Sequence, residues 1–327
     1  MPQVRFSNDE RAIYNVTSIQ SAEETSEFIF WKDEAVVEHR PKTSRQKDTS
    51  LALKGENYLI EGSNFDFIQV KTYDTSGLLI PIFKAERHNT HFEFAIDIGT
   101  SNTHIEYREE GKETKAFDTL TKDQLICPMF VPTKSDNRQK RDLMEEEAEL
   151  TLKDYLPDEI SRESDFFFPT RTVLSYAKNA DWDTIIDPFT LANIPLAYNK
   201  RSPQQGNKYQ CDIKWVGRDE DRMKNFVECL MLMIRNKVLL NEGNLAKTAI
   251  RWTYPLSMPG KRHRILQETW DNTYRKYFCT DGSTGSLSES EAPIIYYFSR
   301  ESTAKEMVNV DTVSYTHLRA HETPEHL

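Results

Sequence analysis

The stretch Phe92–Tyr107 (FEFAIDIGTSNTHIEY) constrains the fold of this chain more than any other. Apolar residues alternate with other residues along 92–98, which is the period of a strand with one buried face. Small and polar residues follow at 99–102, and a second alternating run then begins. The pattern predicts two antiparallel strands joined by a tight turn, with Asp97 near the carboxyl end of the first strand.

The turn of this hairpin has the composition of a phosphate site. Asp97 lies where α/β sheets place their ligand chemistry. Gly99 permits close approach of a ligand to the main chain, Thr100 and Ser101 supply hydroxyls, and successive N–H groups through Asn102 can cradle an anion. A bare carboxylate would repel a phosphate, so Asp97 is predicted to hold Mg²⁺, directly or through water. The alternative is an ordinary hairpin with a polar tip.

Composition and charge exclude several classes of protein. A chain of 327 residues can bury a sizeable core and form one or two domains. The net charge of −10 argues against a nucleic-acid-binding protein, which needs a basic face, but not against a nucleotide site. No apolar run has the length of a membrane span, and the N-terminus lacks the apolar core of a signal peptide. The four cysteines have neither metal-ligand spacing nor a disulfide framework: Cys127, Cys211, Cys229 and Cys279. A cytoplasmic location is therefore expected.

Residues 1–90 are predicted to form a separate β-rich N-terminal unit. Turn residues separate its candidate strands, and the best hairpin flanks 73–77. The charged stretch Arg40–Thr49 is predicted to be a solvated loop. The candidate strands are Phe28–Trp31, Ala35–Val37, Tyr58–Ile60, Phe65–Thr72 and Leu78–Phe83. This unit is either a small sandwich that binds a protein partner or client, or a scaffold extension of the part that follows.

The middle of the chain carries weaker signals. Lys115–Asp118 is a candidate third strand after the hairpin, and Phe166–Tyr176 reads as a further strand. The charged segment 134–160 has helical spacing of its apolar residues and ends at Pro157. Residues 181–208 are predicted to be loop material with only short ordered pieces.

A helix–strand–helix series follows. A helix is predicted from near Asp219 to Leu240, with Gly243 just past its end. Its buried stripe is Met223, Phe226, Val227, Leu230 and Ile234. A strand ending in Tyr254-Pro255 comes next, and a second helix follows Pro259 and Gly260. That helix carries the stripe Leu266, Trp270, Tyr274 and Tyr277, while Met231, Met233 and Trp270 are predicted core residues rather than part of a cofactor site.

The hairpin resembles the first phosphate loop of the superfamily that joins actin, DnaK-type chaperones and sugar kinases. Further resemblances follow in the order of that family. Phe166–Tyr176 is similar to its Pro-Ser/Thr strand, and the region around Tyr254-Pro255 is similar to its Val-Pro-Ala-Tyr-Phe segment with the flanking helices. Ser288–Phe298 resembles the Glu-Pro-x-Ala-Ala helix, although Ile294 and Ile295 replace small residues there.

This resemblance implies an α/β fold, namely the ribonuclease H-like first lobe of an actin/DnaK-type ATPase over residues 91–312. It implies ATP and Mg²⁺ as cofactors, with Asp97 positioning the metal and the residues Gly99, Thr100, Ser101 and Asn102 holding phosphates. Thr100 matches the phosphate-contacting hydroxyl, and Glu291 would orient the attacking water, with Glu289 as the alternate. No secure counterpart of the catalytic lysine is found; Lys178 and Lys214 are guesses that are not assigned as sites.

The last residues differ in kind from the rest. Val313–Leu327 resembles a translated sequencing-adapter tail, and its His317, His321 and His326 lack the ordered scaffold that a metal site needs. The second phosphate loop of the family is not found after Glu291. The expectation is therefore a truncated first lobe with negligible ATP hydrolysis in the chain as given.

The function expected from the resemblance is that of a Mg-dependent ATPase used as a nucleotide-driven, chaperone-like conformational switch. The alternatives are a non-hydrolysing scaffold and an actin-like filament-forming protein. The sugar-kinase branch is less favoured because no acceptor-site motif is recognisable. The expected partners are ATP or ADP and a protein bound through the N-terminal unit, with no nucleic acid.

Overall fold

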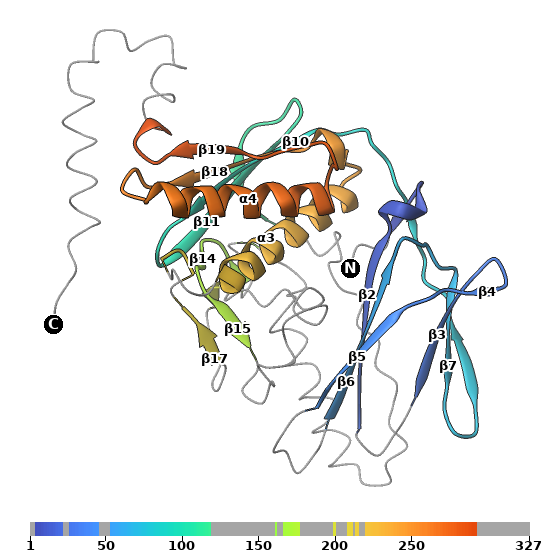
Figure 1. Ribbon diagram of the computed structural model, residues 1–327. Coiled ribbons are helices and arrows are strands. Elements are labelled where there is room, and N and C mark those ends of the chain that lie inside the picture. Colours follow the sequence, from blue (N-terminus) through green and yellow to red (C-terminus); the bar gives the residue numbers. More distant parts are fainter. Residues whose placement is uncertain are drawn as a thin grey trace, which may run out of the picture.

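The computed structural model describes residues 4–21, 26–45, 53–118, 161, 166–176, 199–200, 208–211, 213–215 and 220–292. This part of the chain is mixed α/β, as predicted, with several sheets and few helices. In Figure 1 the N-terminal strands, drawn in blue, lie to one side of a larger sheet that carries the helices α3 and α4. None of the described helices is long and apolar enough to cross a membrane.

The N-terminal strands form two antiparallel sheets and a short parallel pair. A three-stranded sheet has the order β2-β6-β5, a four-stranded sheet the order β4-β3-β7-β8, and β1 pairs with β9. The strands are β1 (Val4–Arg5), β2 (Ile13–Ser21), β3 (Glu27–Lys32), β4 (Ala35–Val36), β5 (Arg40–Arg45), β6 (Leu53–Glu61), β7 (Phe67–Lys71), β8 (Ser76–Leu79) and β9 (Lys84–Ala85), and a short 3-10 helix spans Asp9–Arg11. Aromatic rings pack edge to face between the sheets, including Tyr14, Phe30 and Phe65.

Most of the predicted N-terminal strands are confirmed, with shifted ends. The hairpin of β7 and β8 is present, but its second strand stops at Leu79, before Pro81, which cannot donate to a ladder. The prediction of a loop at Arg40–Thr49 is wrong for Arg40–Arg45, because these residues pair with β6 along their whole length. Among the described strands β5 pairs only with β6, so it lies at one edge of this sheet. Whether 1–90 is a separate domain stays a prediction.

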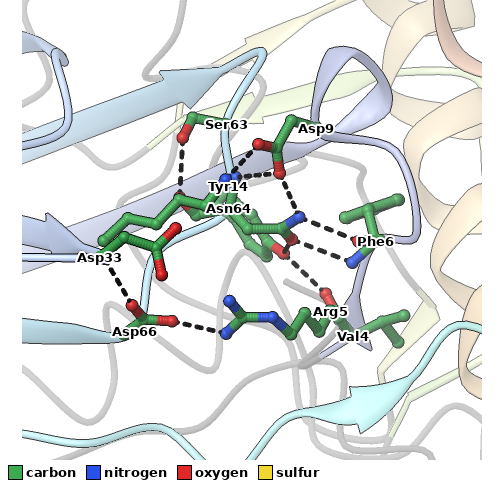
Figure 2. A network of polar contacts seen from close by, with 10 residues as sticks. Val4, Arg5, Phe6, Asp9, Tyr14, Asp33, Ser63, Asn64 and Asp66 are labelled. Atoms are coloured by element: carbon green, nitrogen blue, oxygen red, sulfur yellow. Dashed lines mark hydrogen bonds and ion pairs between the residues drawn. The ribbon is translucent and has the colours of Figure 1, made fainter.

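A buried asparagine ties the first residues of the chain to this unit (Figure 2). The Asn64 side chain donates to the Phe6 carbonyl at 2.9 Å and to Asp9 Oδ1 at 2.6 Å, and its oxygen accepts from Phe6 N–H at 2.9 Å. The Tyr14 hydroxyl lies 2.5 Å from that oxygen and 2.8 Å from the Val4 carbonyl oxygen. Burial raises the pKa of Tyr14. Every polar group of the buried amide is satisfied, as burial requires.

The main sheet has the order β12-β11-β10-β18-β19, with β14 paired to β11. Its strands are β10 (Phe92–Ile98), β11 (Asn102–Glu109), β12 (Lys115–Ala116), β14 (Thr170–Arg171), β18 (Ala249–Tyr254) and β19 (Gly285–Ser288). The predicted hairpin is confirmed as the antiparallel pair β10–β11, and the predicted third strand as β12. On its other side β10 runs parallel to β18, and β18 parallel to β19. The carboxyl ends of β10, β18 and β19 therefore meet at one edge of the sheet.

Helices α3 (Glu220–Leu240) and α4 (Gly260–Tyr277) cover one face of this sheet (Figure 1). The predicted stripes of both helices are buried, as are Met231, Met233 and Trp270. Trp270 of α4 stacks on Trp252 of β18 at 5.9 Å between ring centroids. Residues 92, 94, 96 and 98 of β10 point to the covered face, whereas Glu93, Ala95 and Asp97 are exposed on the opposite face. The strict alternation predicted from sequence is thus confirmed.

The segment Phe166–Tyr176 is not one strand, contrary to the prediction. It is divided into β13 (Phe166–Phe167), β14 and β15 (Leu174–Tyr176), because Pro169 offers no N–H to continue a ladder. β13 pairs with β16 (Asn199–Lys200), and β15 pairs with β17 (Lys208–Gln210), so β16 and the start of β17 are short ordered pieces within 181–208. The predictions for 134–160, for the helix beyond Ala292 and for the tail 313–327 lie outside the described residues.

Buried polar groups connect the helices to their surroundings. The guanidinium of Arg235 in α3 donates to the carbonyls of Tyr277 and Arg11, each at 3.2 Å, and lies over the ring of Phe6 at 5.0 Å. Burial, together with the charge of Arg11, lowers the pKa of Arg235 to about 10. This side chain joins both helices to the N-terminal strands.

A second polar connection joins α3 to the hairpin. Asp118 accepts from the Tyr107 hydroxyl at 2.5 Å and pairs with the buried Lys237 of α3 at 3.6 Å. Partial burial works to raise the pKa of Asp118, but the Tyr107 hydrogen bond and the charges of Lys237 and Lys115 outweigh it, and the pKa is lowered. The carboxylate is therefore held in its charged form between the sheet and the helix.

Gly243 is required by packing rather than by its backbone angle. The left-handed residue after α3 is Glu242, with φ 59°, and not the glycine that the sequence pattern suggested. A Cβ at position 243 would lie 2.5 Å from Val238 Cγ1 and 2.8 Å from Phe92 Cε2. The backbone here thus passes directly against the first residue of β10.

Gly243→Ala is expected to destabilise the protein by roughly 1–3 kcal/mol, the usual cost of overpacking. Gly260→Ala is the matched control, since a Cβ at this first residue of α4 meets nothing within 4 Å. We expect the control to be neutral or slightly stabilising, because alanine favours helix. Urea denaturation of both variants measures the difference; equal midpoints would contradict the packing described here.

Candidate functional site

The carboxyl edge of β10, β18 and β19 gathers most of the predicted site residues. The turn at 99–101 follows β10, the Pro255 loop follows β18, and residues 289–292 follow β19. The short segment 213–215 reaches the same edge, because Trp215 contacts Thr100 and Lys214 contacts Glu289. Residues far apart in the chain therefore surround one end of the sheet, the end at which parallel strands usually present ligand sites.

Asp97 is held by the neighbouring parallel strand. The hydroxyl of Thr253 in β18 donates to Asp97 Oδ1 at 2.7 Å, and both side chains lie on the sheet face away from α3 and α4. A carboxylate has about four acceptor positions, so this hydrogen bond orients the group and leaves most of its capacity for a ligand. Asp97 is thus an exposed, oriented carboxylate at the strand end where it was predicted.

The turn after Asp97 is tight and partly closed on itself. Gly99 N–H donates to the Asn102 carbonyl at 2.8 Å, so this amide is not available to an anion, in contrast to the predicted cradle. A Cβ on Gly99 would lie 2.6 Å from the Asn102 carbonyl oxygen, which is why only glycine fits. Thr100, Ser101 and Asn102 are exposed to solvent.

Two buried threonines, Thr103 and Thr172, lie beneath the turn on its protein side and hold its backbone. The Thr172 hydroxyl donates to the Gly99 carbonyl at 2.7 Å and lies 2.9 Å from the hydroxyl of Thr103, while Thr172 N–H donates to the Ser101 carbonyl at 2.9 Å. Sequence reasoning did not identify Thr172 as a site residue. Its only signal was its place in the Phe166–Tyr176 segment. The turn is consequently rigid on the protein side.

Trp215 contacts the turn from outside. Its indole N–H donates to Thr100 Oγ1 at 2.9 Å, although the residue is 43% exposed. An indole nitrogen only donates, so the threonine oxygen is the acceptor and its own proton is left to donate elsewhere. The segment that carries Trp215 is anchored by Arg262, which donates to the carbonyls of Ile213 and Lys214 at 3.2–3.3 Å.

Lys214 is a buried cation at this edge. Its side chain is 4% exposed and its Nζ lies 2.9 Å from Glu289 Oε1. It also lines an apolar hollow of about 10 Å³, which has room for at most one water. The other lining residues are Ile98, Ile213, Met223, Phe226, Val227 and Leu266. Lys214, which the sequence analysis named as a candidate without assigning it, is therefore the cation that the fold brings to the end of β10.

Glu291 lies three residues past the end of β19, and its side chain caps the helical turn that starts after Ser288. Its Oε2 accepts from the hydroxyl of the buried Ser288 at 2.7 Å and from Ser288 N–H at 3.4 Å, and Glu291 N–H donates to Ser288 Oγ at 3.2 Å. This is the reciprocal capping box of a helix start. The fold thus brings Glu291 to the edge that holds Asp97, but its carboxylate is engaged locally, whereas the alternate Glu289 is paired with Lys214.

Asp97 is a single carboxylate rather than part of a metal cage. Within the described ranges, no group of three or more His, Cys, Asp or Glu side chains is placed to hold a metal ion. Mg²⁺ commonly takes one or two carboxylates and completes its shell with water and substrate phosphates. The donor set at Asp97 suits that mode of binding and not an all-protein metal site.

Comparisons with protein-family models, with curated proteins and with solved structures found no match for this chain.

The Lys214–Glu289 pair gives an asymmetric prediction. Glu289→Ala leaves a buried ammonium without its partner and is expected to destabilise the protein by about 3–5 kcal/mol. Lys214→Met fills the same space with an apolar chain and leaves Glu289, whose side chain is 32% exposed, to be solvated. We expect Lys214→Met to be neutral or stabilising. Urea denaturation compares the two; equal losses of stability would mean that Lys214 is not buried as described.

Proposed function

We propose that the carboxyl edge of β10, β18 and β19 binds the phosphates of Mg·ATP, as the first lobe of an actin/DnaK-type ATPase would. The observation that carries the proposal is the convergence on one edge of the oriented carboxylate Asp97, the Thr100 hydroxyl and the buried cation Lys214. These are the three kinds of group that a metal-bound phosphate needs: a metal ligand, a neutral donor and a positive charge.

The strand order of the main sheet supports this proposal. An antiparallel meander, β10-β11-β12, has its first strand at the centre, and two parallel strands that follow helices extend the sheet on the other side of β10. This is the arrangement expected of a ribonuclease H-like lobe. It places the turn after the first strand next to the ends of both parallel strands, which an isolated polar hairpin would not require.

The residues present suit Mg²⁺ and phosphate in distinct ways. Asp97, oriented by Thr253, would ligate the metal directly or through water. When bound, Mg²⁺ would neutralise phosphate charge. Thr100 would donate its free proton to a phosphate oxygen, since Trp215 occupies the oxygen as acceptor. Lys214 would supply positive charge near the end of β10, although its pairing with Glu289 partly neutralises that charge.

Hydrolysis would need a carboxylate to orient water, and here two functions compete. The first is an ATP-hydrolysing, chaperone-like switch, in which Glu289 or Glu291 would orient the water. The helices α3 and α4 would transmit movement in this switch, since Arg235 of α3 contacts the N-terminal residues Arg11 and Phe6. The engagement of Glu291 in a cap and of Glu289 by Lys214 favours the second candidate, a nucleotide-binding scaffold that does not hydrolyse. An actin-like filament is a further proposal with no observation of its own.

Asp97→Ala is expected to abolish binding of Mg·ATP by this chain. The site residues are mostly exposed, so each contact is screened by water, and we expect a dissociation constant on the order of 1 mM for the unaltered chain. Isothermal titration calorimetry at millimolar nucleotide, with and without Mg²⁺, provides the measurement.

Glu93→Ala is the matched control, because Glu93 lies on the same face of β10 at its other end. We expect this variant to bind as the unaltered chain does. The proposal fails if the unaltered chain shows no Mg-dependent binding at all, or if both variants bind equally well.

A further inference from the structure

The outer face of the four-stranded sheet β4-β3-β7-β8 is apolar and accessible. Val36 pairs with Trp31, and Trp31 stacks on Phe67 of the next strand at 6.1 Å between centroids. By strand alternation, Leu78 of β8 lies on this same face, since it pairs with Gln69, and Gln69 accepts from the Trp31 indole. Val36 and Leu78 are 54% and 58% exposed. We call this surface, formed by Val36, Trp31, Phe67 and Leu78, the outer apolar face.

The edge strand beside this face is short, is followed by Pro81 and carries no charge. Residues 75–83, which contain β8, include no charged side chain, and among the described strands β8 pairs only with β7. Ile80 and Ile82 continue the exposed apolar side chains beyond Leu78. Natural edge strands carry charges, bulges or covering segments, because a bare edge pairs with other strands. An extended segment can thus pair with β8 and present alternate side chains to the outer apolar face.

The charges around this face are mostly acidic. Asp33 and Glu34 form the β3–β4 turn, Glu27 begins β3, and Asp74 lies in the β7–β8 turn, all exposed. The nearby bases are Lys71, which lies opposite Glu27, and Lys32, which is paired with Asp9. A ligand with basic residues flanking an apolar centre complements this rim.

The surface is also fixed before any ligand arrives. Asp33 N–H donates to Asp66 Oδ2 at 3.0 Å, and Arg5 donates to Asp66 Oδ1 at 2.7 Å, as Figure 2 shows. These bonds hold the β3–β4 turn against the body of the unit, and the turn leads directly into β4, which contains Val36. A preformed surface lowers the entropic cost of binding.

A second copy of the chain is a poor occupant. Each copy carries a net charge of −10 and would bring the same acidic rim. The face is small as well, because it is formed by four apolar side chains, whereas a stable interface uses about 20–30 residues on each side. A stable protein–protein interface buries about 800 Å² on each partner. An extended peptide segment suits both the charge and the size.

We propose that the N-terminal strands bind an extended segment of a partner protein, with alternating apolar residues and basic flanks, which adds to the sheet as a strand beside β8. The apolar residues contact the outer apolar face, and the basic flanks lie at its acidic rim. This inference does not depend on nucleotide binding.

The test uses the full chain and the labelled synthetic peptide KKVTVTVKK in a fluorescence anisotropy titration. We expect saturable binding that weakens about tenfold when the flanking lysines become glutamates, and that is lost when the central valine becomes proline. In the protein, Leu78→Ser is expected to weaken binding about tenfold. Leu256→Ser, which alters a leucine that is 69% exposed on the other part of the molecule, is the matched control and should bind unchanged.

Three results would overturn the proposal. The first is no saturable binding of the lysine-flanked peptide. The second is equal binding by Leu78→Ser and Leu256→Ser, which would place the contact elsewhere. The third is a concentration-dependent dimer in sedimentation that excludes the peptide, since the face would then belong to a second copy.

Discussion

The parallel pairing of β10 with β18 is the contact on which the rest of the structure depends. It joins the hairpin, formed by local sequence, to the helix–strand–helix series that begins more than a hundred residues later. The pairing buries Phe94 and Ile96 against the helices and leaves Asp97 beside Thr253. Without it, β10 would be the edge strand of the small antiparallel sheet β12-β11-β10, and no parallel strand would lie beside Asp97.

The elements with strong periodicity could be predicted from sequence. Strict alternation defined β10, and stripes at helical spacing defined α3 and α4, because a single buried face leaves a regular pattern. The strand at Arg40–Arg45 could not be predicted in this way, since an edge strand has little buried surface and tolerates charge. The position of Gly243 was read correctly as a helix end, but its cause is contact with Phe92, which only the tertiary structure reveals.

Only the residues of the candidate site that are adjacent in the sequence could be predicted from it. Asp97 and the turn are adjacent in sequence, so their composition indicated the chemistry directly. Thr253, Trp215 and Lys214 reach the site through the tertiary fold, and a lone threonine, tryptophan or lysine carries no signal of that kind. The capping box of Glu291, in contrast, is local, since Ser288-x-x-Glu291 is the sequence pattern of such a cap. Glu291, which the resemblance assigned to catalysis, is therefore engaged in capping the turn after β19.

The proposed site requires that a phosphate at the end of β10 be contacted by both the turn and the 213–215 segment. The direct measurement is amide nuclear magnetic resonance of the ¹⁵N-labelled chain during titration with Mg·ATP and with Mg²⁺ alone. We predict that the amide signals of Thr100–Asn102 and the indole signal of Trp215 shift together, with one binding constant, and only when both nucleotide and metal are present. Shifts confined to other parts of the molecule, or a turn that responds while Trp215 does not, would contradict it.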